Sequence, residues 1–299
     1  MASLKQWDRT WFNRFKKIYA ANISMLALYP SDALGWMRIM DVAYGKKQAE
    51  RAIRNPDQDV QVAKNEEYTK PKYAASEIIT LDMPAFMDEL RVREEYYAGD
   101  VANALGHVAD INANYKRAIM KAAWLGLTTN PYMYGIEQTT VSGSTTIETP
   151  GNADTAAVLS TVGAWSTFQN MSVDIANCIA RLEEKGFYGP KALLAPPLLR
   201  PFLSRYRIEY SDTHYTFGVP VYYNPYIDTG ATNAAAAIYI VDTDAFELHM
   251  TPFKARAYWN DEVESYVWRW KVRMVPMAIP KNDGTDYLKG IIGFDIDVI

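Results

Sequence analysis

Several features that mark secreted or membrane proteins are absent from this sequence of 299 residues. Cys178 is the only cysteine, so the chain cannot form an internal disulfide. No run of about eighteen apolar residues occurs, which argues against a membrane-spanning helix. The N-terminus has Trp7, Asp8 and Arg9 where a signal peptide would need an apolar run. We therefore expect a soluble protein that is made inside a cell and has no membrane partner.

The sequence also lacks the motifs and clusters that carry catalysis. It contains no Gly-x-Ser-x-Gly elbow, no Gly-x-Gly-x-x-Gly and no phosphate loop. His107, His214 and His249 are far apart and do not have metal-ligand spacing. Cys178 lies in an apolar helical pattern, so we expect it to pack in the core, and His249 inside a strand is expected to be structural. Asp242-Thr243-Asp244 is interpreted as a strand-ending turn, so the sequence predicts no catalytic residue, metal or cofactor.

Aromatic residues and unevenly distributed charge are what the sequence has in abundance. Aromatic residues make up 13% of the chain, with 21 Tyr and 8 Trp. They are enriched at protein–protein interfaces, although large β cores use them too. Residues 1–54 hold ten Lys/Arg and four Asp/Glu, a net +6 that leaves −10 for residues 55–299. A basic arm on an acidic body can attract nucleic acid or an acidic neighbouring subunit, and an ordinary solvated helix is the alternative.

The stretch around residues 100–125 predicts one long helix, around which the chain is organised. Asp100 suits the N-cap, and Gly126 suits the position just beyond the C-terminus. Such a helix would be about 39 Å long at 1.5 Å per residue. It carries no site chemistry, so we interpret it as a structural beam. The apolar residues that recur at helical spacing are Val101, Ala104, Leu105, Val108, Ile111, Tyr115, Ile119, Ala122 and Leu125.

The remaining pattern mixes helices and strands. Before the long helix we expect helices at 4–29 and 33–42, a β-hairpin or excursion with a charged tip at 55–75, and a strand at 78–81 followed by an acidic stretch. Strict period-two alternation over 266–274 predicts a long strand, paired with 246–259 through Asn260-Asp261. The other expected elements are an exposed loop at 138–154, a helix at 155–185, strands at 192–195, 214–227, 237–241 and 291–296, and a short helix at 197–205.

The order of these elements resembles the Hong Kong 97 phage capsid fold, and within it most resembles encapsulin-like shell proteins. Residues 78–86 resemble the strand that returns from the extended loop of that fold. Tyr134-Gly135-Ile136-Glu137 resembles its Gly-Ile-x-Gly turn without the second glycine. Residues 186–194 resemble its Gly-Pro-x-Ala-Leu strand, and residues 244–250 resemble its terminal Phe-Glu-Leu strand. Each motif is short, and their order and spacing over residues 60–280 carry the resemblance.

The resemblance implies an α+β chain with the Hong Kong 97-type fold. Its implied parts are an N-terminal arm (1–54), an extended loop (55–84), a peripheral domain with the spine helix and long hairpin (85–137 and 244–299) and an axial domain (138–243). The implied function is self-assembly of many copies into a closed icosahedral shell. The first hypothesis is the major capsid protein of a virus or provirus, the second is an encapsulin-type compartment with an enzyme cargo, and a β-rich hydrolase is the third.

The viral hypothesis implies a virion that is assembled in the host cytoplasm, packaged double-stranded DNA held by non-specific charge contacts, and portal, scaffold or decoration proteins as further partners. The cations expected to face nucleic acid are Arg14, Lys16, Lys17, Lys46, Lys47, Arg51 and Arg54. The expected inter-subunit contacts are Lys64, Lys70, Lys72, Tyr73, Trp268 and Trp270. Some shells of this fold join a loop lysine covalently to an asparagine of a neighbouring subunit. Lys64, Lys70 and Lys72 are placed for such a link, and the alternative is that they are ordinary solvated lysines.

Overall fold

In the computed structural model the described residues fall into nine longer segments and several short pieces. The segments are 34–54, 76–93, 117–127, 168–201, 218–227, 235–252, 254–260, 265–279 and 290–297, and the pieces are 114, 133, 135–136, 140–141, 145–146, 203, 262, 281–282 and 287–288. The predicted helix at 4–29, the start of the long helix and the tip of the hairpin at 55–75 lie outside these residues.

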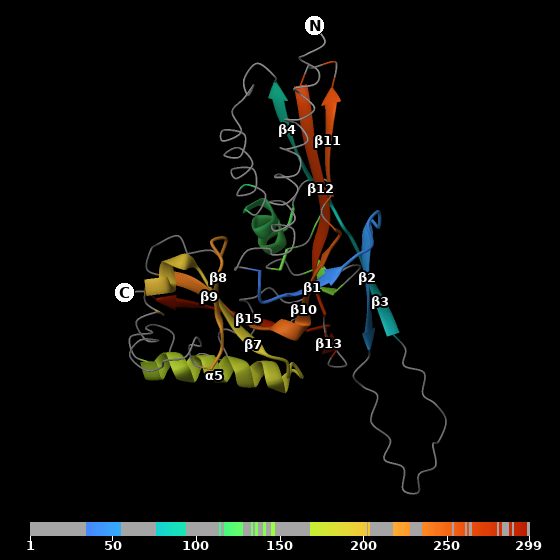
Figure 1. Ribbon diagram of the computed structural model, residues 1–299. Coiled ribbons are helices and arrows are strands. Elements are labelled where there is room, and N and C mark those ends of the chain that lie inside the picture. Colours follow the sequence, from blue (N-terminus) through green and yellow to red (C-terminus); the bar gives the residue numbers. More distant parts are fainter. Residues whose placement is uncertain are drawn as a thin grey trace, which may run out of the picture.

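A long five-stranded sheet is built around β12 (Ser265–Ala278) (Figure 1). The first half of β12 pairs antiparallel with β11 (Lys254–Asn260) and β4 (Ala85–Arg93), one on each side. Its last five residues pair with β10 (Phe246–Met250), which in turn pairs in parallel with β1 (Arg38–Asp41). The predicted long hairpin is therefore confirmed.

Two parts of this sheet differ from the sequence prediction. The helix expected at 33–42 is wrong, because Leu34, Trp36 and Met37 are buried in a turn and the following residues pair with β10 as β1. Tertiary pairing here overrides local helical preference. The stretch after Pro84, expected only as an acidic segment, is the nine-residue strand β4.

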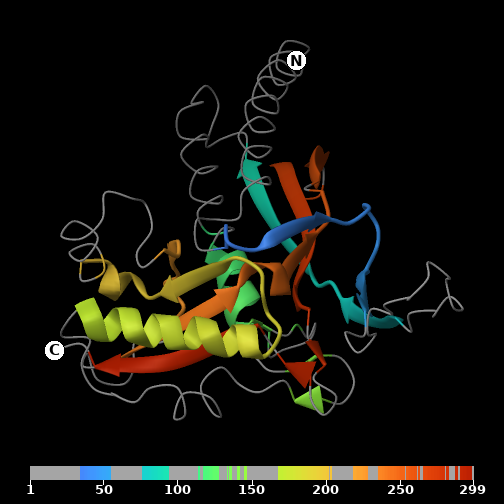
Figure 2. The same ribbon diagram turned by 90° about the horizontal axis from the view of Figure 1, so that it is seen from below.

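A second, four-stranded sheet lies across the base of the first, with helix α5 (Phe168–Glu184) along one of its faces (Figures 1 and 2). Ile175, Cys178 and Leu182 are the buried residues that helical spacing puts on one side of α5. The C-terminal strand belongs to this sheet, whereas the sequence assigned residues 244–299 to the domain with the long hairpin. The strand order is β15 (Ile291–Asp297), β9 (Ala235–Asp242), β7 (Lys191–Ala195) and β8 (Val221–Tyr223).

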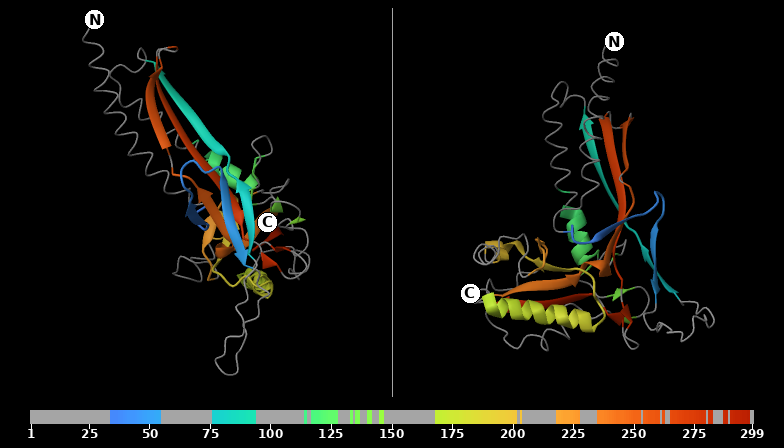
Figure 3. Two further views of the ribbon diagram at one scale, coloured as in Figure 1. Left: turned by 90° about the vertical axis from the view of Figure 1, so that its right-hand side faces the viewer. Right: turned by 60° about the horizontal axis from the view of Figure 1, so that its bottom comes forward.

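The predicted hairpin is a separate two-stranded ribbon that projects from the side of the body (Figures 1 and 3). Its strands, β2 (Gln48–Arg54) and β3 (Ser76–Asp82), pair antiparallel over seven residues each. The stem thus begins inside the stretch that the sequence assigned to the N-terminal arm. The remaining short elements are η1 (Pro197–Leu199), η2 (Thr243–Ala245), β5 (Thr140–Val141), β6 (Thr145–Thr146), β13 (Lys281–Asn282) and β14 (Tyr287–Leu288).

The end of the long helix matches the prediction. Residues 117–125 are helical, and Gly126 follows with a φ of 76°, as expected of a residue just beyond a helix C-terminus. The chain then returns, because the N–H of Ile136 donates to the carbonyl of Ala123 at 2.9 Å. Gly135 passes so close to the helix end that a Cβ there would overlap the backbone of Trp124. This contact gives a physical reason for the glycine in the Gly-Ile motif.

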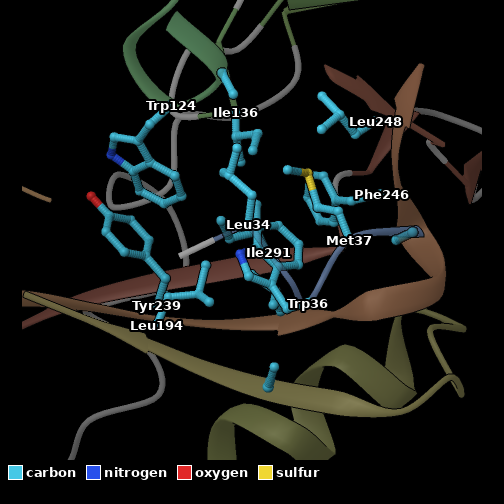
Figure 4. Close-up of a cluster of buried hydrophobic side chains, with 14 of the residues drawn as sticks. Leu34, Trp36, Met37, Trp124, Ile136, Leu194, Tyr239, Phe246, Leu248 and Ile291 are labelled. Atoms are coloured by element: carbon cyan, nitrogen blue, oxygen red, sulfur yellow. The ribbon is translucent and has the colours of Figure 1, made fainter. Parts of the chain in front are cut away.

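Buried apolar side chains join the helix end, the turn at 34–37 and both sheets into one core (Figure 4). Trp124 packs edge-on against Tyr239 of β9, with ring centroids 5.1 Å apart. Trp36 packs edge-on against Phe246 of β10, with centroids 5.3 Å apart. Each edge-to-face pair contributes about 1 kcal/mol beyond its buried area. The N-terminal turn is therefore an internal part of the body.

A buried ion pair lies at the end of the four-stranded sheet, beside the turn that leads into the long sheet. The Lys191 Nζ lies 3.1 Å from the Asp242 Oδ2, and their side chains are only 6% and 3% exposed. Lys191 also donates to the carbonyls of Phe187 and Gly189. Asp242 Oδ2 accepts from the Gly189 N–H at 2.8 Å, and its Oδ1 accepts from the Asp244 N–H at 3.0 Å. The strand-ending turn predicted at 242–244 is confirmed as η2, and it leads directly from β9 into β10.

Replacing Asp242 with Asn should therefore lower the free energy of unfolding by about 3 kcal/mol, because it leaves the buried Lys191 ammonium without its counter-charge. Guanidinium unfolding followed by tryptophan fluorescence measures this. The matched control is Asp41→Asn at an exposed position of β1, which should change the value by less than about 0.5 kcal/mol. Equal, small effects of both substitutions would contradict the assigned role of this ion pair.

Candidate assembly surfaces

The outer face of the hairpin stem is exposed and acidic. The register pairs Gln48 with Asp82, Glu50 with Thr80 and Ala52 with Ile78, so these residues share one face of the ribbon. Gln48, Glu50 and Asp82 are exposed, and the Gln48 Nε2 donates to the Asp82 Oδ1 at 3.0 Å. Ile78 is 63% exposed on the same face. We call Gln48, Glu50, Ile78 and Asp82 the outer stem face.

The inner face of the stem contacts the body. Ala49 is 1% exposed, and Leu81 packs against the core. The Arg51 guanidinium lies 3.3 Å from the Glu247 Oε1 of β10. At the end of the stem, the Arg273 Nη1 donates to the Met83 carbonyl at 2.7 Å. The stem is thus anchored by two polar contacts and a small apolar patch.

One face of the long sheet is basic. Arg91 and Arg269 have side chains 60% and 54% exposed, and Lys271 and Arg273 follow on β12. The register also sets Lys254 of β11 opposite Lys271, and Arg256 opposite Arg269. Met87 is opposite Lys271, and Tyr258 is opposite Val267, so both lie on the same face of the sheet as these cations. Met87 is 60% exposed and Tyr258 is 38% exposed. We call Arg91, Arg269, Lys271 and Arg273 the basic sheet face.

Glu89 organises the centre of this face. It lies directly opposite Arg269, and its Oε2 accepts from the Arg269 Nη2 at 2.6 Å and from Nε at 3.0 Å. Its Oε1 accepts from the Arg91 Nε at 2.6 Å. The hydrogen bonds from Arg269 and Arg91 lower the pKa of the Glu89 carboxyl, and the bond with Glu89 raises the pKa of Arg269. One carboxylate therefore orients two cations, and the face keeps a net positive charge.

The sequence prediction overlooked this cluster because it overlooked β4. The signal was present in the alternation of Phe86, Asp88, Leu90 and Val92 with residues of the other face. The acidic residues around Glu94 made the stretch look like a solvated segment. The pairing of Glu89 with Arg269 joins residues 180 positions apart, so only the register reveals it.

The structure describes only two of the six residues expected to make inter-subunit contacts. Trp268 and Trp270 lie on β12, where Trp268 is opposite Leu90 and Ala257, and Trp270 is opposite Asp88 and Ala255. By strand alternation these positions belong to the face opposite the basic one. Their role in subunit contact stays a prediction. Lys64, Lys70, Lys72 and Tyr73 lie outside the described residues.

The basic arm is likewise partly described. Lys46 and Lys47 are exposed in the turn between β1 and β2, which contains Gly45 at a φ of 98°. Arg51 is paired with Glu247, so part of its charge is already neutralised within the chain. Arg54 is the last residue of β2, opposite Ser76. Arg14, Lys16 and Lys17 lie outside the described residues, and contact of any of these cations with nucleic acid stays a prediction.

The residues that could carry chemistry are buried or paired. Cys178 is fully buried, and burial together with Asp174 raises the pKa of its thiol to about 12, which suits a core residue and not a nucleophile. His249 Nε2 lies 3.0 Å from the Glu247 Oε2 inside β10. Within the described segments no three His, Cys, Asp or Glu side chains form a metal site, and no helix is long and apolar enough to cross a membrane. His107 and His214 lie outside these segments.

Comparison with known proteins shows similarity in structure but not in sequence. No family model and no curated protein matches the sequence. A protein of Microbacterium phage Oxtober96 matches with a TM-score of 0.59 at 14% identity, over 88% of this chain and 90% of that one. The capsid of a native GTA particle matches with a TM-score of 0.57 at 9% identity, over 89% and 90%.

The capsid of Myoviridae phage XM1 matches with a TM-score of 0.53 at 13% identity, over 89% of this chain and 90% of that one. These matches extend over nearly nine tenths of this chain and of the chains that it matches. The order of elements agrees with the one from which the resemblance was inferred. The chain therefore has the fold of the Hong Kong 97-type phage capsid proteins.

Proposed function

We propose that this chain is a major capsid protein, which assembles in many copies into a closed icosahedral shell around a viral genome. The observation that carries the proposal is the structural match, over 89% of this chain, to the capsids of a GTA particle and of a phage. The proposed location is the virion, with assembly in the host cytoplasm.

Two charged surfaces support assembly between copies. The outer stem face is acidic with an exposed Ile78, and the basic sheet face is positive with an exposed Met87. Glu50, Ile78 and Asp82 on one surface and Arg91, Arg269 and Met87 on the other are exposed, so both surfaces are accessible to a neighbouring copy. Contact between two different surfaces of identical copies is heterologous, and it closes into rings when the rotation permits. Opposite charges then fix the register, while apolar contacts contribute most of the buried area.

The proposal predicts that the purified full-length chain forms closed shells visible by negative-stain electron microscopy, and that these elute far ahead of a 33.9 kDa monomer in size-exclusion chromatography. Raised salt should weaken the charged contacts and slow assembly from separated subunits. A chain that stays monomeric at high concentration under all salt conditions would contradict the proposed function.

Charge reversal tests the two surfaces. Glu50→Lys with Asp82→Lys, or Arg91→Glu with Lys271→Glu, should each reduce shell yield at least about tenfold, because like charges then face each other. All four substitutions in one chain restore opposite charges and should recover shells. Light scattering during assembly measures the yields.

The matched control for charge reversal is Glu183→Lys, at an exposed position near the end of α5, which should assemble normally. Normal yield from both double variants, or no recovery in the fourfold variant when all of the proteins are folded by circular dichroism, would reject the pairing of these surfaces. The proposal of shell formation would then stand without it.

A viral shell must neutralise phosphate charge, and we propose that the cations of residues 1–54 contribute to this through salt-sensitive contacts with double-stranded DNA. Lys46 and Lys47, which are both exposed in the turn between β1 and β2, are the described residues on which we test this. Lys46→Glu with Lys47→Glu should lower the nuclease-protected nucleic acid per particle, read from absorbance at 260 and 280 nm. Lys46→Arg with Lys47→Arg keeps the charge and should package normally.

The alternative is an encapsulin-type compartment with an enzyme cargo. The solved structures that the chain matches are described as phage, capsid and GTA particles, which favours the viral proposal. Portal, scaffold or decoration proteins are then the expected further partners. Particles that contain a co-purifying enzyme and no nucleic acid, with unchanged content after reversal of Lys46 and Lys47, would favour the compartment.

A further inference from the structure

A buried carboxylate occupies an unusual position in β10. Glu247 is 2% exposed and lies between Phe246 and Leu248, which are 1% and 0% exposed. In the sheet it is opposite Arg38 of β1 and Met277 of β12. Removing a charge from water is costly unless partners compensate it. Glu247 therefore needs partners that compensate its buried charge.

The compensation comes from two different parts of the fold. His249, two residues further along β10, places its Nε2 3.0 Å from the Glu247 Oε2. Arg51 of the hairpin stem lies 3.3 Å from the other carboxylate oxygen, Oε1. Burial raises the pKa of Glu247, but the His249 hydrogen bond and the charges of Arg51, His249 and Arg38 lower it overall, so the carboxylate is ionised at neutral pH.

The stem has few other means of keeping its orientation. β2 and β3 form a two-stranded sheet of their own, and a lone hairpin is only marginally stable without packing partners. Its described contacts with the body include the buried Ala49, the packed Leu81 and, at its end, the buried Met83, whose carbonyl accepts from Arg273. The apolar contacts are non-directional and tolerate small rotations of the ribbon. The Arg51–Glu247 pair fixes a specific atom of the stem against the rigid sheet.

We infer that Glu247, together with Arg51 and His249, is a positioning residue that fixes the angle at which the hairpin leaves the body and so determines how neighbouring copies meet. The inference rests on the proposed shell-forming function. Apolar replacements of a buried ion pair are often as stable as the pair itself, and a buried pair serves best where one geometry must be selected over others. A projecting ribbon that carries the outer stem face is such a case, because a small rotation at its base moves its far end by a large distance.

Glu247→Gln keeps the size of the side chain and removes its charge. The Arg51 side chain, which is 39% exposed, can then turn toward water, so the body should stay folded. In hydrogen exchange of the unassembled chain, the amides of β2 and β3 should exchange about tenfold faster, while those of β7 and β9 should be unchanged. Electron microscopy of the assembled protein should show particles of mixed diameter or open sheets.

Further variants separate positioning from general stability. Arg51→Gln should reproduce both effects, and the double variant should be no worse than either single variant because the two residues act as one contact. Arg51→Lys keeps a charge within reach and should restore most of the uniform shells. Glu184→Gln, which removes the exposed ion pair with Arg181 on α5, is the matched control and should behave as the unmodified chain.

Two results would overturn the inference: uniform shells and unchanged stem exchange in Glu247→Gln, or faster exchange spread equally over β2, β3, β7 and β9. Failure of the unmodified chain to assemble is a different outcome, because it rejects the proposed function, while hydrogen exchange still tests the anchoring of the stem.

Discussion

The turn that leads from the four-stranded sheet into the long sheet depends on the buried pair between Lys191 and Asp242. Both side chains are almost fully removed from water, and the carboxylate also accepts from two backbone N–H groups. These bonds fix the turn where β9 of one sheet becomes β10 of the other. At the same turn the Thr243 N–H donates to the Pro190 carbonyl and the Asp242 N–H donates to the Gly290 carbonyl, so three chain segments meet here. Directed bonds thus fix the point where the chain passes from one sheet to the other, and the apolar core packs around it.

Stability and recognition use different residues in this chain. The core is made of aliphatic and aromatic side chains from both sheets, the helix end and the N-terminal turn, and their burial supplies the main favourable free energy of folding. The two charged surfaces proposed for assembly lie on the parts that extend from this core, which are the hairpin stem and the long sheet. Glu89 and Glu247 have comparable roles there, since each carboxylate orients cations from neighbouring elements. An exposed ion pair such as Glu89–Arg269 contributes little to the free energy of folding. Its effect is to hold the Arg269 guanidinium in one orientation on the surface.

Patterns that are local in the sequence predicted local structure well, and interactions between distant segments were not predictable. The alternation around Trp268 and the glycine at 126 indicated β12 and the end of the long helix, because strand and helix periods and left-handed caps are properties of adjacent residues. The helix expected at 33–42 was wrong because parallel pairing with β10, more than 200 residues away, determines that segment. No sequence signal joins Arg51 to Glu247 either, since the residues are far apart and each is ordinary in its own segment. The fold as a whole was identified from the order and spacing of several short motifs. No single motif was specific enough to identify it alone.

The pairing of β12 also has a mechanical consequence. This fourteen-residue strand is bonded along its length to β11, β4 and β10, and in antiparallel pairs the hydrogen bonds run perpendicular to the strands. Tension applied along the strand therefore loads all of these bonds simultaneously in shear, whereas a peeling force at one end would break them one after another. A subunit whose neighbours pull it along the axis of β12 would resist stretching far better than one pulled across it. Stiffness in the plane of a container wall would thus depend on the orientation of a single strand.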